Sequence, residues 1–132
     1  MIKTMRIQTR RHTEVVNVTR EVMEMIGGAL DGLALVYTPH TTVALLLCED
    51  DDELRHDLIH AAEGWLADCR PFTHNRNNNP NAEAHILSAF GGSRLLVAIE
   101  SGKPNLGTYQ HILLVELDGP KQREIRCQTI AA

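Results

Sequence analysis

The chain has 132 residues, 43% of them hydrophobic, with 13 Lys and Arg against 17 Asp and Glu, and 7 His outside that count. This length fits one domain that buries a core without disulfides or a structural metal. The net charge of −4 and the few aromatic residues argue against a nucleic-acid partner, which needs a basic face and stacking platforms.

The sequence also favours a cytoplasmic protein with no membrane partner. The longest apolar run, residues 43–47, is far shorter than the roughly 20 residues that cross a bilayer. The N-terminus carries no apolar signal segment. The three cysteines are widely spaced and form no C-x-x-C pair, which is typical of reduced thiols.

The first quarter of the chain predicts two strands and a helix. Polar and apolar residues alternate over residues 2–9 and 12–18, as they do in half-buried strands. From Thr19 the apolar residues recur at helical spacing, on the stripe Val22, Met25, Ile26, Ala29 and Leu30.

The middle of the chain predicts buried strands followed by two helices. Apolar runs at 33–37 and 41–47 flank Pro39, so they form two strands or one strand broken there. An acidic run opens a second helix that reaches about residue 68. Its apolar stripe is Leu54, Leu58, Ala61, Ala62, Trp65 and Leu66. Residues 69–81 have loop composition, and Asn81 is placed to cap a short helix over 82–90.

Three strands are expected to finish the chain, over 94–100, 108–117 and 122–130. The turn Asp118-Gly119-Pro120 predicts a hairpin between the last two. The order is therefore ββ-α-ββ-αα-βββ. We predict a single α+β domain over residues 1–132, with a mixed or largely antiparallel sheet covered by helices.

Seven histidines in so small a domain call for a test of metal or acid–base chemistry. His56 and His60 lie one helical turn apart, but opposite the predicted apolar stripe and without the glutamate of a zincin helix, so we predict solvated surface. His12 and His111 are interpreted as surface and packing residues. The remaining three lie at a strand kink, in a loop and on a short helix: His40, His74 and His85. Three neutral imidazoles of this kind can hold zinc with one position open to water or substrate.

Two further segments carry candidate groups. Most of the acidic run is explained by the helix dipole, which favours acids in a first turn. Glu49, beside the apolar strand, and Asp52 are the two that we retain as site candidates. Residues 102–110 combine two glycines, Lys103, hydroxyl groups and amides, which together can hold an anion.

These same segments resemble the YjbQ family of small bacterial and archaeal proteins. The resemblance rests on His40-Thr41-Thr42 before an apolar strand and the acidic segment Glu49 to Asp52. It rests also on His74 followed by Asn81-Ala82-Glu83-Ala84-His85, and on Gly107-Thr108-Tyr109-Gln110 before an Asp-Gly-Pro turn. It spans roughly residues 10–130 and is therefore global.

The resemblance implies an α+β protomer in a compact homotrimer, with sites near the subunit boundaries and a metal on His40, His74 and His85. It also implies a secondary thiamine-phosphate synthase, which joins hydroxymethylpyrimidine diphosphate to thiazole phosphate and releases pyrophosphate. The sequence departs from the family pattern in two ways. Tyr109 replaces the usual Trp. The segment 94–102 lacks the usual Ser before the strand and the usual basic residue before Gly102, where Glu100 and Ser101 stand instead, so phosphate binding at that turn rests on Lys103.

The first hypothesis is therefore an enzyme that handles small phosphorylated molecules with a divalent metal as Lewis acid. Glu49 and Asp52 would be the catalytic carboxylates that orient water or metal. The substrate-binding residues would be Thr41, Lys103, Thr108, Tyr109 and Gln110, with Tyr109 stacking on a ring. Three imidazoles suit zinc better than magnesium, so a zinc-dependent hydrolase of a phosphorylated compound fits the ligands at least as well.

Two alternatives belong to other classes. The sequence shows no activated nucleophile of the Ser–His–Asp or Cys–His kind, which is compatible with a non-catalytic trimer that binds a metal or a small phosphorylated ligand. The histidines and polar loops could also serve only to support a trimer interface.

Overall fold

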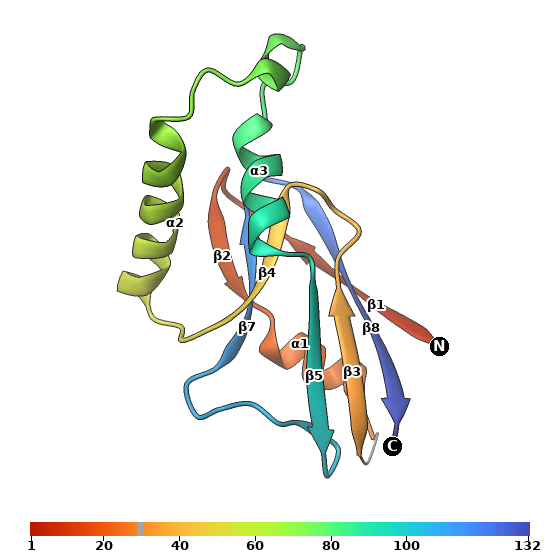
Figure 1. Ribbon diagram of the computed structural model, residues 1–132. Coiled ribbons are helices and arrows are strands. Elements are labelled where there is room, and N and C mark those ends of the chain that lie inside the picture. The colour runs from red at the N-terminus through yellow and green to blue at the C-terminus, as the bar shows by residue number, and fades with distance from the viewer. Residues whose placement is uncertain (29–30) are drawn as a thin grey trace.

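The computed structural model describes residues 1–28 and 31–132, and its strands form two antiparallel sheets. The first sheet has five strands, in the order β1 (Ile2–Gln8), β8 (Gln122–Ala131), β3 (Gly32–Tyr37), β5 (Arg94–Glu100) and β6 (Lys103–Pro104) (Figure 1). The second has three, in the order β2 (Glu14–Asn17), β7 (His111–Glu116) and β4 (Val43–Cys48).

The helices are α1 (Thr19–Ile26), α2 (Asp52–Ala67) and α3 (Ala82–Gly91), with a 3-10 helix, η1 (Thr73–Arg76), between the last two. Figure 1 shows α2 and α3 on one side of the three-stranded sheet. The N-cap of α2 is Asp51, whose Oδ1 accepts a hydrogen bond from the Leu54 amide at 2.7 Å. Among the described helices, none is both long enough and apolar enough to span a membrane.

The fold has three layers, the five-stranded sheet, the three-stranded sheet and the helices α2 and α3, and an apolar cluster lies between each two neighbouring layers. The larger lies between the two sheets and includes α1, with Val22, Val36 and Leu114 fully buried. The smaller lies between the other face of the three-stranded sheet and α2 and α3, and includes Ala84 and Leu113. Because the three-stranded sheet is covered on both faces, its strands β4 and β7 have continuous apolar runs rather than alternation.

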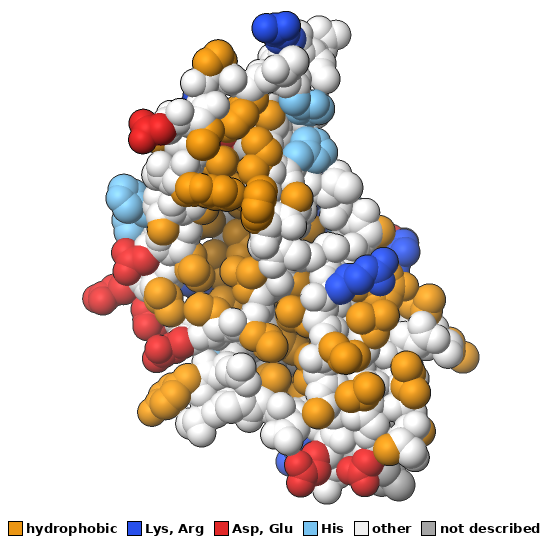
Figure 2. All heavy atoms as spheres, viewed as in Figure 1, with side chains coloured by type: hydrophobic (Ala, Val, Ile, Leu, Met, Phe, Trp, Pro, Cys, Tyr) orange, Lys and Arg blue, Asp and Glu red, His pale blue; other side chains and the backbone are white. Residues whose placement is uncertain are grey.

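The outer face of the five-stranded sheet is uncovered in the single chain. Side chains alternate between the faces of a strand, and in β3 Ala34 points into the core while Leu33 is exposed. Leu96 of β5 and Ile130 of β8 are also exposed large apolar residues. Figure 2 shows hydrophobic side chains gathered over this part of the molecule.

The α+β class and the predicted order of helices and strands are confirmed, but the hairpin at Asp118-Gly119-Pro120 was wrong. β7 pairs with β2 and β4, while β8 pairs with β1 and β3, so the turn carries the chain from one sheet to the other. A Cβ on Gly119 would lie 2.4 Å from the Arg11 carbonyl oxygen. The glycine therefore reflects a close backbone approach and does not specify which strands pair.

Three smaller predictions also changed. Residues 108–110 form an exposed turn before β7, and the loop at 69–81 contains η1. On α2, Leu66 is buried as expected but Trp65 is 50% exposed. The expected apolar positions 29 and 30 lie outside the described residues.

Candidate functional site

The candidate site lies where the chain crosses between the two sheets. One crossing is residues 38–42 and the other is residues 117–121, and they are joined by a hydrogen bond from the Leu117 amide to the Thr42 carbonyl oxygen at 3.2 Å. Both crossings lie outside the strands, so their backbone groups are not paired in a sheet, and both contain polar residues. The predicted residues His40 and Thr41 lie in the first crossing, and Thr41 is exposed.

A buried ion pair lies beneath these crossings. Arg123 Nε donates to Glu116 Oε1 at 2.8 Å, and Thr9 Oγ1 donates to the same oxygen at 2.7 Å. The other carboxylate oxygen accepts from Arg123 Nη2 and from the amides of Leu117 and Asp118. Burial raises the pKa of Glu116, but the hydrogen bonds outweigh burial and hold the pKa below its ordinary value. The carboxylate is therefore ionised and fully hydrogen-bonded.

His74 of η1 and His85 of α3 lie close together, and Asn81 connects His74 to Asp118 of the 117–121 crossing. Their ring centroids are 5.1 Å apart and the ring planes are nearly perpendicular, at 82°. They line a cavity of about 400 Å³ together with Phe72, Thr73, Ala82 and Ile86. In Figure 2 a group of histidine side chains is visible beside the upper part of α3.

Asn81 orients the ring of His74 through a hydrogen bond to Nε2. Its Nδ2 donates to Asp118 Oδ2 at 3.1 Å, so its Oδ1 faces His74 Nε2, at 2.9 Å. Because an amide oxygen only accepts, His74 must carry its proton on Nε2. The Nδ1 lone pair is then available for a metal or a proton. Asn81 is the N-cap residue of α3 as expected, but its side chain makes no capping hydrogen bond to the helix.

His40 is held differently. Its Nε2 accepts a hydrogen bond from the Glu124 amide at 2.9 Å. Burial lowers the pKa of His40, and Arg123 lowers it further. A neutral His40 that accepts this bond carries its proton on Nδ1, so neither ring nitrogen offers a free lone pair in this conformation.

The structure therefore brings together two of the three predicted metal ligands. Within the part of the chain that is described, no group of three or more His, Cys, Asp or Glu side chains is placed to hold a metal ion. The donor set of His74 and His85 fits a transition ion in ligand type, and lacks a third protein ligand in a single chain.

The other predicted residues lie at the opposite end of the three-stranded sheet. Gln110 directly precedes β7 and Leu117 directly follows it, so a six-residue strand of about 20 Å separates the two ends. Glu49 follows β4 at the end where Cys48 pairs with His111. Thr108 and Lys103 are exposed, and Lys103 lies on the edge strand β6. Within one chain these residues and the histidine pair do not meet.

The loop at that end is closed on itself but exposed. Gln110 Oε1 accepts from the Gly107 amide at 2.8 Å, and the Gln110 amide donates to the Gly107 carbonyl oxygen at 3.1 Å. Tyr109 is 71% exposed and therefore has a nearly bare ring available for stacking.

A second polar network ties α2 to the three-stranded sheet near this loop. Arg55 donates to both oxygens of Asp50, at 2.5 and 2.8 Å, and to the Val15 carbonyl oxygen at 2.7 Å. Asn17 Nδ2 lies 2.9 Å from Asp50 Oδ2 and 3.2 Å from His111 Nδ1. The Arg55 hydrogen bonds lower the pKa of Asp50 to about 2. His111 thus joins a hydrogen-bonded network, beyond its expected packing role.

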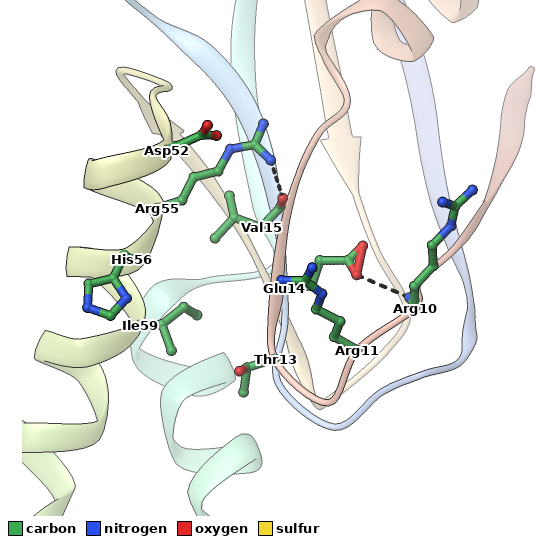
Figure 3. Close-up of a pocket in the computed structure, with 9 residues that line it drawn as sticks. All are labelled: Arg10, Arg11, Thr13, Glu14, Val15, Asp52, Arg55, His56 and Ile59. Carbon is green, nitrogen blue, oxygen red and sulfur yellow. Dashed lines mark hydrogen bonds between the residues drawn. The ribbon is translucent and has the colours of Figure 1, made fainter.

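A cavity of about 650 Å³ includes Asp52 but no other predicted site residue in its lining (Figure 3). It lies between the β1–β2 connection and α2, and its lining includes Arg11, Thr13 and His56. Figure 3 shows Arg55 reaching from α2 to Val15 on β2, whereas Arg10 extends away from α2. The Arg55 guanidinium at this cavity is therefore already hydrogen-bonded to Asp50 and to the Val15 carbonyl oxygen.

Sequence reasoning missed the roles of four residues at or next to the crossings: Asn81, Glu116, Asp118 and Arg123. One signal was present, because Glu116 interrupts the apolar run of residues 112–117. A charge in a strand that is otherwise fully apolar indicates a buried and paired group.

The fold and the crossing together define a two-sheet α+β protein with an imidazole pair beside a buried ion pair. The family model described as UPF0047 protein YjbQ-like matches residues 3–132, and the chain belongs to this family.

Relatives of known sequence agree with this assignment. A UPF0047 protein of Archaeoglobus fulgidus is 37% identical over 119 residues, which are 90% of this chain and 93% of that protein. The UPF0047 protein YugU of Bacillus subtilis is 34% identical over 128 residues, 93% of this chain and 94% of that one.

Solved structures share the fold over the whole chain. The crystal structure of hypothetical protein APE1520 from Aeropyrum pernix K1 has a TM-score of 0.93 and 30% identity, and the match covers 100% of this chain and 99% of that one. A YbjQ-like protein of unknown function from Sulfolobus solfataricus has a TM-score of 0.93 and 29% identity, covering 100% and 97%.

Proposed function

We propose that this protein is a metal-assisted enzyme that acts on a small phosphorylated compound, with His74 and His85 as the metal-binding pair. The observation that carries the proposal is the hydrogen-bonded chain from Asp118 through Asn81 to His74 Nε2. Histidines that bind metals usually donate their other ring N–H to such a partner, which sets the tautomer and orients the ring.

The donor set favours zinc. Imidazole nitrogens suit zinc, whereas magnesium prefers oxygen ligands and keeps several waters. Zinc held by this pair would supply Lewis-acid chemistry to a phosphate oxygen. The adjoining cavity of about 400 Å³ has the size of a small-molecule site, and its Phe72 and Ile86 offer apolar contact.

His40 is included in the proposed metal site as the third ligand. To serve there it must turn its ring so that Nε2 leaves the Glu124 amide. A His40→Gln variant tests this point: metal affinity falls if His40 is a ligand and stays unchanged if substrate or a second copy fills the third position.

A homotrimer is the second part of the proposal. One small ligand cannot contact both the histidine pair and the Gly107–Gln110 loop of the same chain, because β7 separates them by about 20 Å. A neighbouring copy can supply the loop, with Tyr109 and Gln110, to the histidines of the first. The exposed apolar residues Leu33, Leu96 and Ile130 make the outer face of the five-stranded sheet the contact surface that we propose.

Two reactions fit such a site. Thiamine-phosphate synthesis is the reaction that the family resemblance implies, with Glu49 and Asp52 as catalytic carboxylates supplied at the loop end. Hydrolysis of a phosphorylated compound is favoured by the imidazole donor set, because zinc activates water near neutral pH. In both, Thr41, Lys103 and Thr108 would bind substrate oxygens.

Metal analysis tests the first part of the proposal. Untagged protein prepared without chelator should hold about one zinc ion per chain at this pair, and His85→Gln should lose it. Asn81→Ala should weaken zinc binding by about 10- to 100-fold, because it removes the partner of His74 Nε2. His12→Gln is the control, an exposed histidine that contacts the 117–121 crossing but is not part of the proposed metal pair. Equal zinc binding in all four proteins would overturn the proposed metal site.

An activity assay separates the reactions. Zinc-loaded protein is supplied with hydroxymethylpyrimidine diphosphate and thiazole phosphate, and pyrophosphate, coupled product and free phosphate are measured. Glu49→Gln should lose turnover and keep its zinc. Normal zinc content with no turnover in the unmodified protein would instead make it a non-catalytic metal-binding protein.

A further inference from the structure

The exposed face of α2 presents two histidines that face each other. His56 and His60 lie one helical turn apart, and their ring centroids are 5.9 Å apart with the planes only 9° from parallel. Both side chains are exposed, and neither ring makes a hydrogen bond to any residue that the structure describes. Nothing in the described chain therefore accounts for their arrangement by packing or hydrogen bonding.

Carboxylates continue the same stripe of the helix in both directions. At 3.6 residues per turn, Asp52, His56, His60 and Glu63 fall within about 80° of one another around the helix axis. A hollow beside His56 is lined by Asp52, Glu53 and Asp57. Figure 2 shows a group of histidines on the outer side of α2, bordered by acidic side chains.

We propose that this face of α2 is a second metal site, a two-histidine chelate formed by His56 and His60 for a first-row transition ion. Zinc lies about 2.0–2.1 Å from each imidazole nitrogen, so the two nitrogens must come within about 4 Å. The ring centroids are 5.9 Å apart, so the exposed rings must turn about their side-chain bonds to bring two nitrogens that close. Formation of the helix holds the two side chains on adjacent turns, so little ordering is needed on binding.

The acidic surroundings add to the attraction for a cation. Asp52, Glu53, Asp57 and Glu63 raise the local cation concentration, and the two on the stripe lie one turn from an imidazole. Because no third protein ligand is already in place among the described residues, water fills the remaining positions. Such a site exchanges its ion readily, and affinity should rise from zinc to Cu²⁺, the order typical of nitrogen donors.

The ligands of this site are separate from the proposed metal pair, because His56 and His60 lie on α2, whereas His74 and His85 belong to η1 and α3. Asp52 is the one residue that the two proposals share. The experiment uses a His74→Gln/His85→Gln background, so that only the α2 site is measured, and titrates Cu²⁺ and Zn²⁺ separately by calorimetry. We expect one ion per chain. His60→Gln should lower the affinity at least tenfold, because a chelate becomes a single ligand, and Glu63→Gln should lower it several-fold.

A second measurement does not depend on the background variant. Cu²⁺ added to the unmodified protein should broaden the amide resonances of residues 52–63, and His60→Gln should remove that broadening while leaving any effect near His85. His12→Gln is the control for a single exposed histidine and should bind as the background does. The absence of saturable binding in the background, or binding that His60→Gln leaves unchanged, would overturn the proposal.

Discussion

The two ends of the three-stranded sheet are each closed by an arginine–carboxylate pair, and the pairs differ in burial. At the crossing end, the side chains of Arg123 and Glu116 are 4% and 0% exposed. At the loop end, the side chains of Arg55 and Asp50 are 34% and 10% exposed. The first pair joins two sheets and the second joins α2 to β2.

This difference indicates which half of the proposed site is rigid in one chain. Around Glu116 each charge has several partners, and the two crossings that carry His40 and Asp118 adjoin that network. Asn81 is hydrogen-bonded to Asp118. At the other end the ion pair supports α2, while Tyr109 projects from a loop held by its own hydrogen bonds. The histidine end is thus held by a buried network, whereas the loop end is held by local hydrogen bonds and leaves Tyr109 exposed.

Breaking the buried pair should have the largest effect. Arg123→Met leaves the Glu116 carboxylate buried without its main partner, and we expect a loss of about 3–5 kcal/mol in the free energy of unfolding. This is a large share of the about 5–15 kcal/mol of a typical domain. Denaturant unfolding measures it. Arg123→Met combined with Glu116→Leu should recover much of the loss, because the unpaired charge is then absent.

The exposed pair of Arg126 and Glu124 provides the control. Its side chains are 36% and 32% exposed, so Arg126→Met should cost much less than Arg123→Met. A loss for Arg123→Met as small as that for Arg126→Met would mean that burial does not distinguish the pairs, and the comparison between the two ends would fail.

The pair at the loop end should give an intermediate, pH-dependent effect. The pKa of Asp50 falls from 3.8 to about 2 on folding, so its contribution is fully present above pH 3.8 and is lost as the pH falls through about 2. A shift of this size corresponds to about 2 kcal/mol at most. Screening of the partly exposed Arg55 reduces the expected cost of Asp50→Asn at pH 7 to about 1 kcal/mol.

Unfolding of Asp50→Asn and the unmodified protein is compared from pH 7 to pH 2. The two stabilities should converge toward the acid end of that range, because protonation removes the same charge that the substitution removes. Glu49→Gln, at a position next to Asp50 in sequence, is the control and should show no such convergence. A constant difference over the whole range would show that the Asp50 charge does not support α2.

The sequence predicted the strands and helices well where a local pattern decides them. Residues 41–47 were expected as a buried strand because their apolar residues are continuous, and residues 108–117 were expected as a strand. The observed strands β4 and β7 lie within or close to these bounds, in the sheet that is covered on two sides. The partner of each strand is a long-range property, however. The Asp118-Gly119-Pro120 turn reverses the chain equally well within a sheet or between sheets, so the division into two sheets could not be predicted from it.

For the candidate site, too, the sequence identified some of the residues but not how they are arranged in space. His74 and His85 were selected because polar loop residues surround them, and the structure places them together. Their distance from Glu49 and Gln110 depends on which ends of β4 and β7 meet, which no local pattern encodes. The roles of Asn81 and Arg123 were missed because each acts through a partner that is distant in sequence, Asp118 or Thr42.

Substitution of the loop aromatic should have the smallest effect on folding and the clearest effect on assembly. Because Tyr109 is 71% exposed, Tyr109→Ala should change the unfolding free energy of the single chain by less than about 0.5 kcal/mol. If a neighbouring copy covers the ring, as we propose, the same variant shifts the monomer–trimer equilibrium toward monomer, and its melting temperature becomes more dependent on concentration. Sedimentation over a concentration series measures this shift, with Trp65→Ala as an exposed aromatic control on α2. Identical sedimentation of Tyr109→Ala and the unmodified protein would show that the loop contacts no neighbouring copy, and the histidine end would then have to bind its ligand without it.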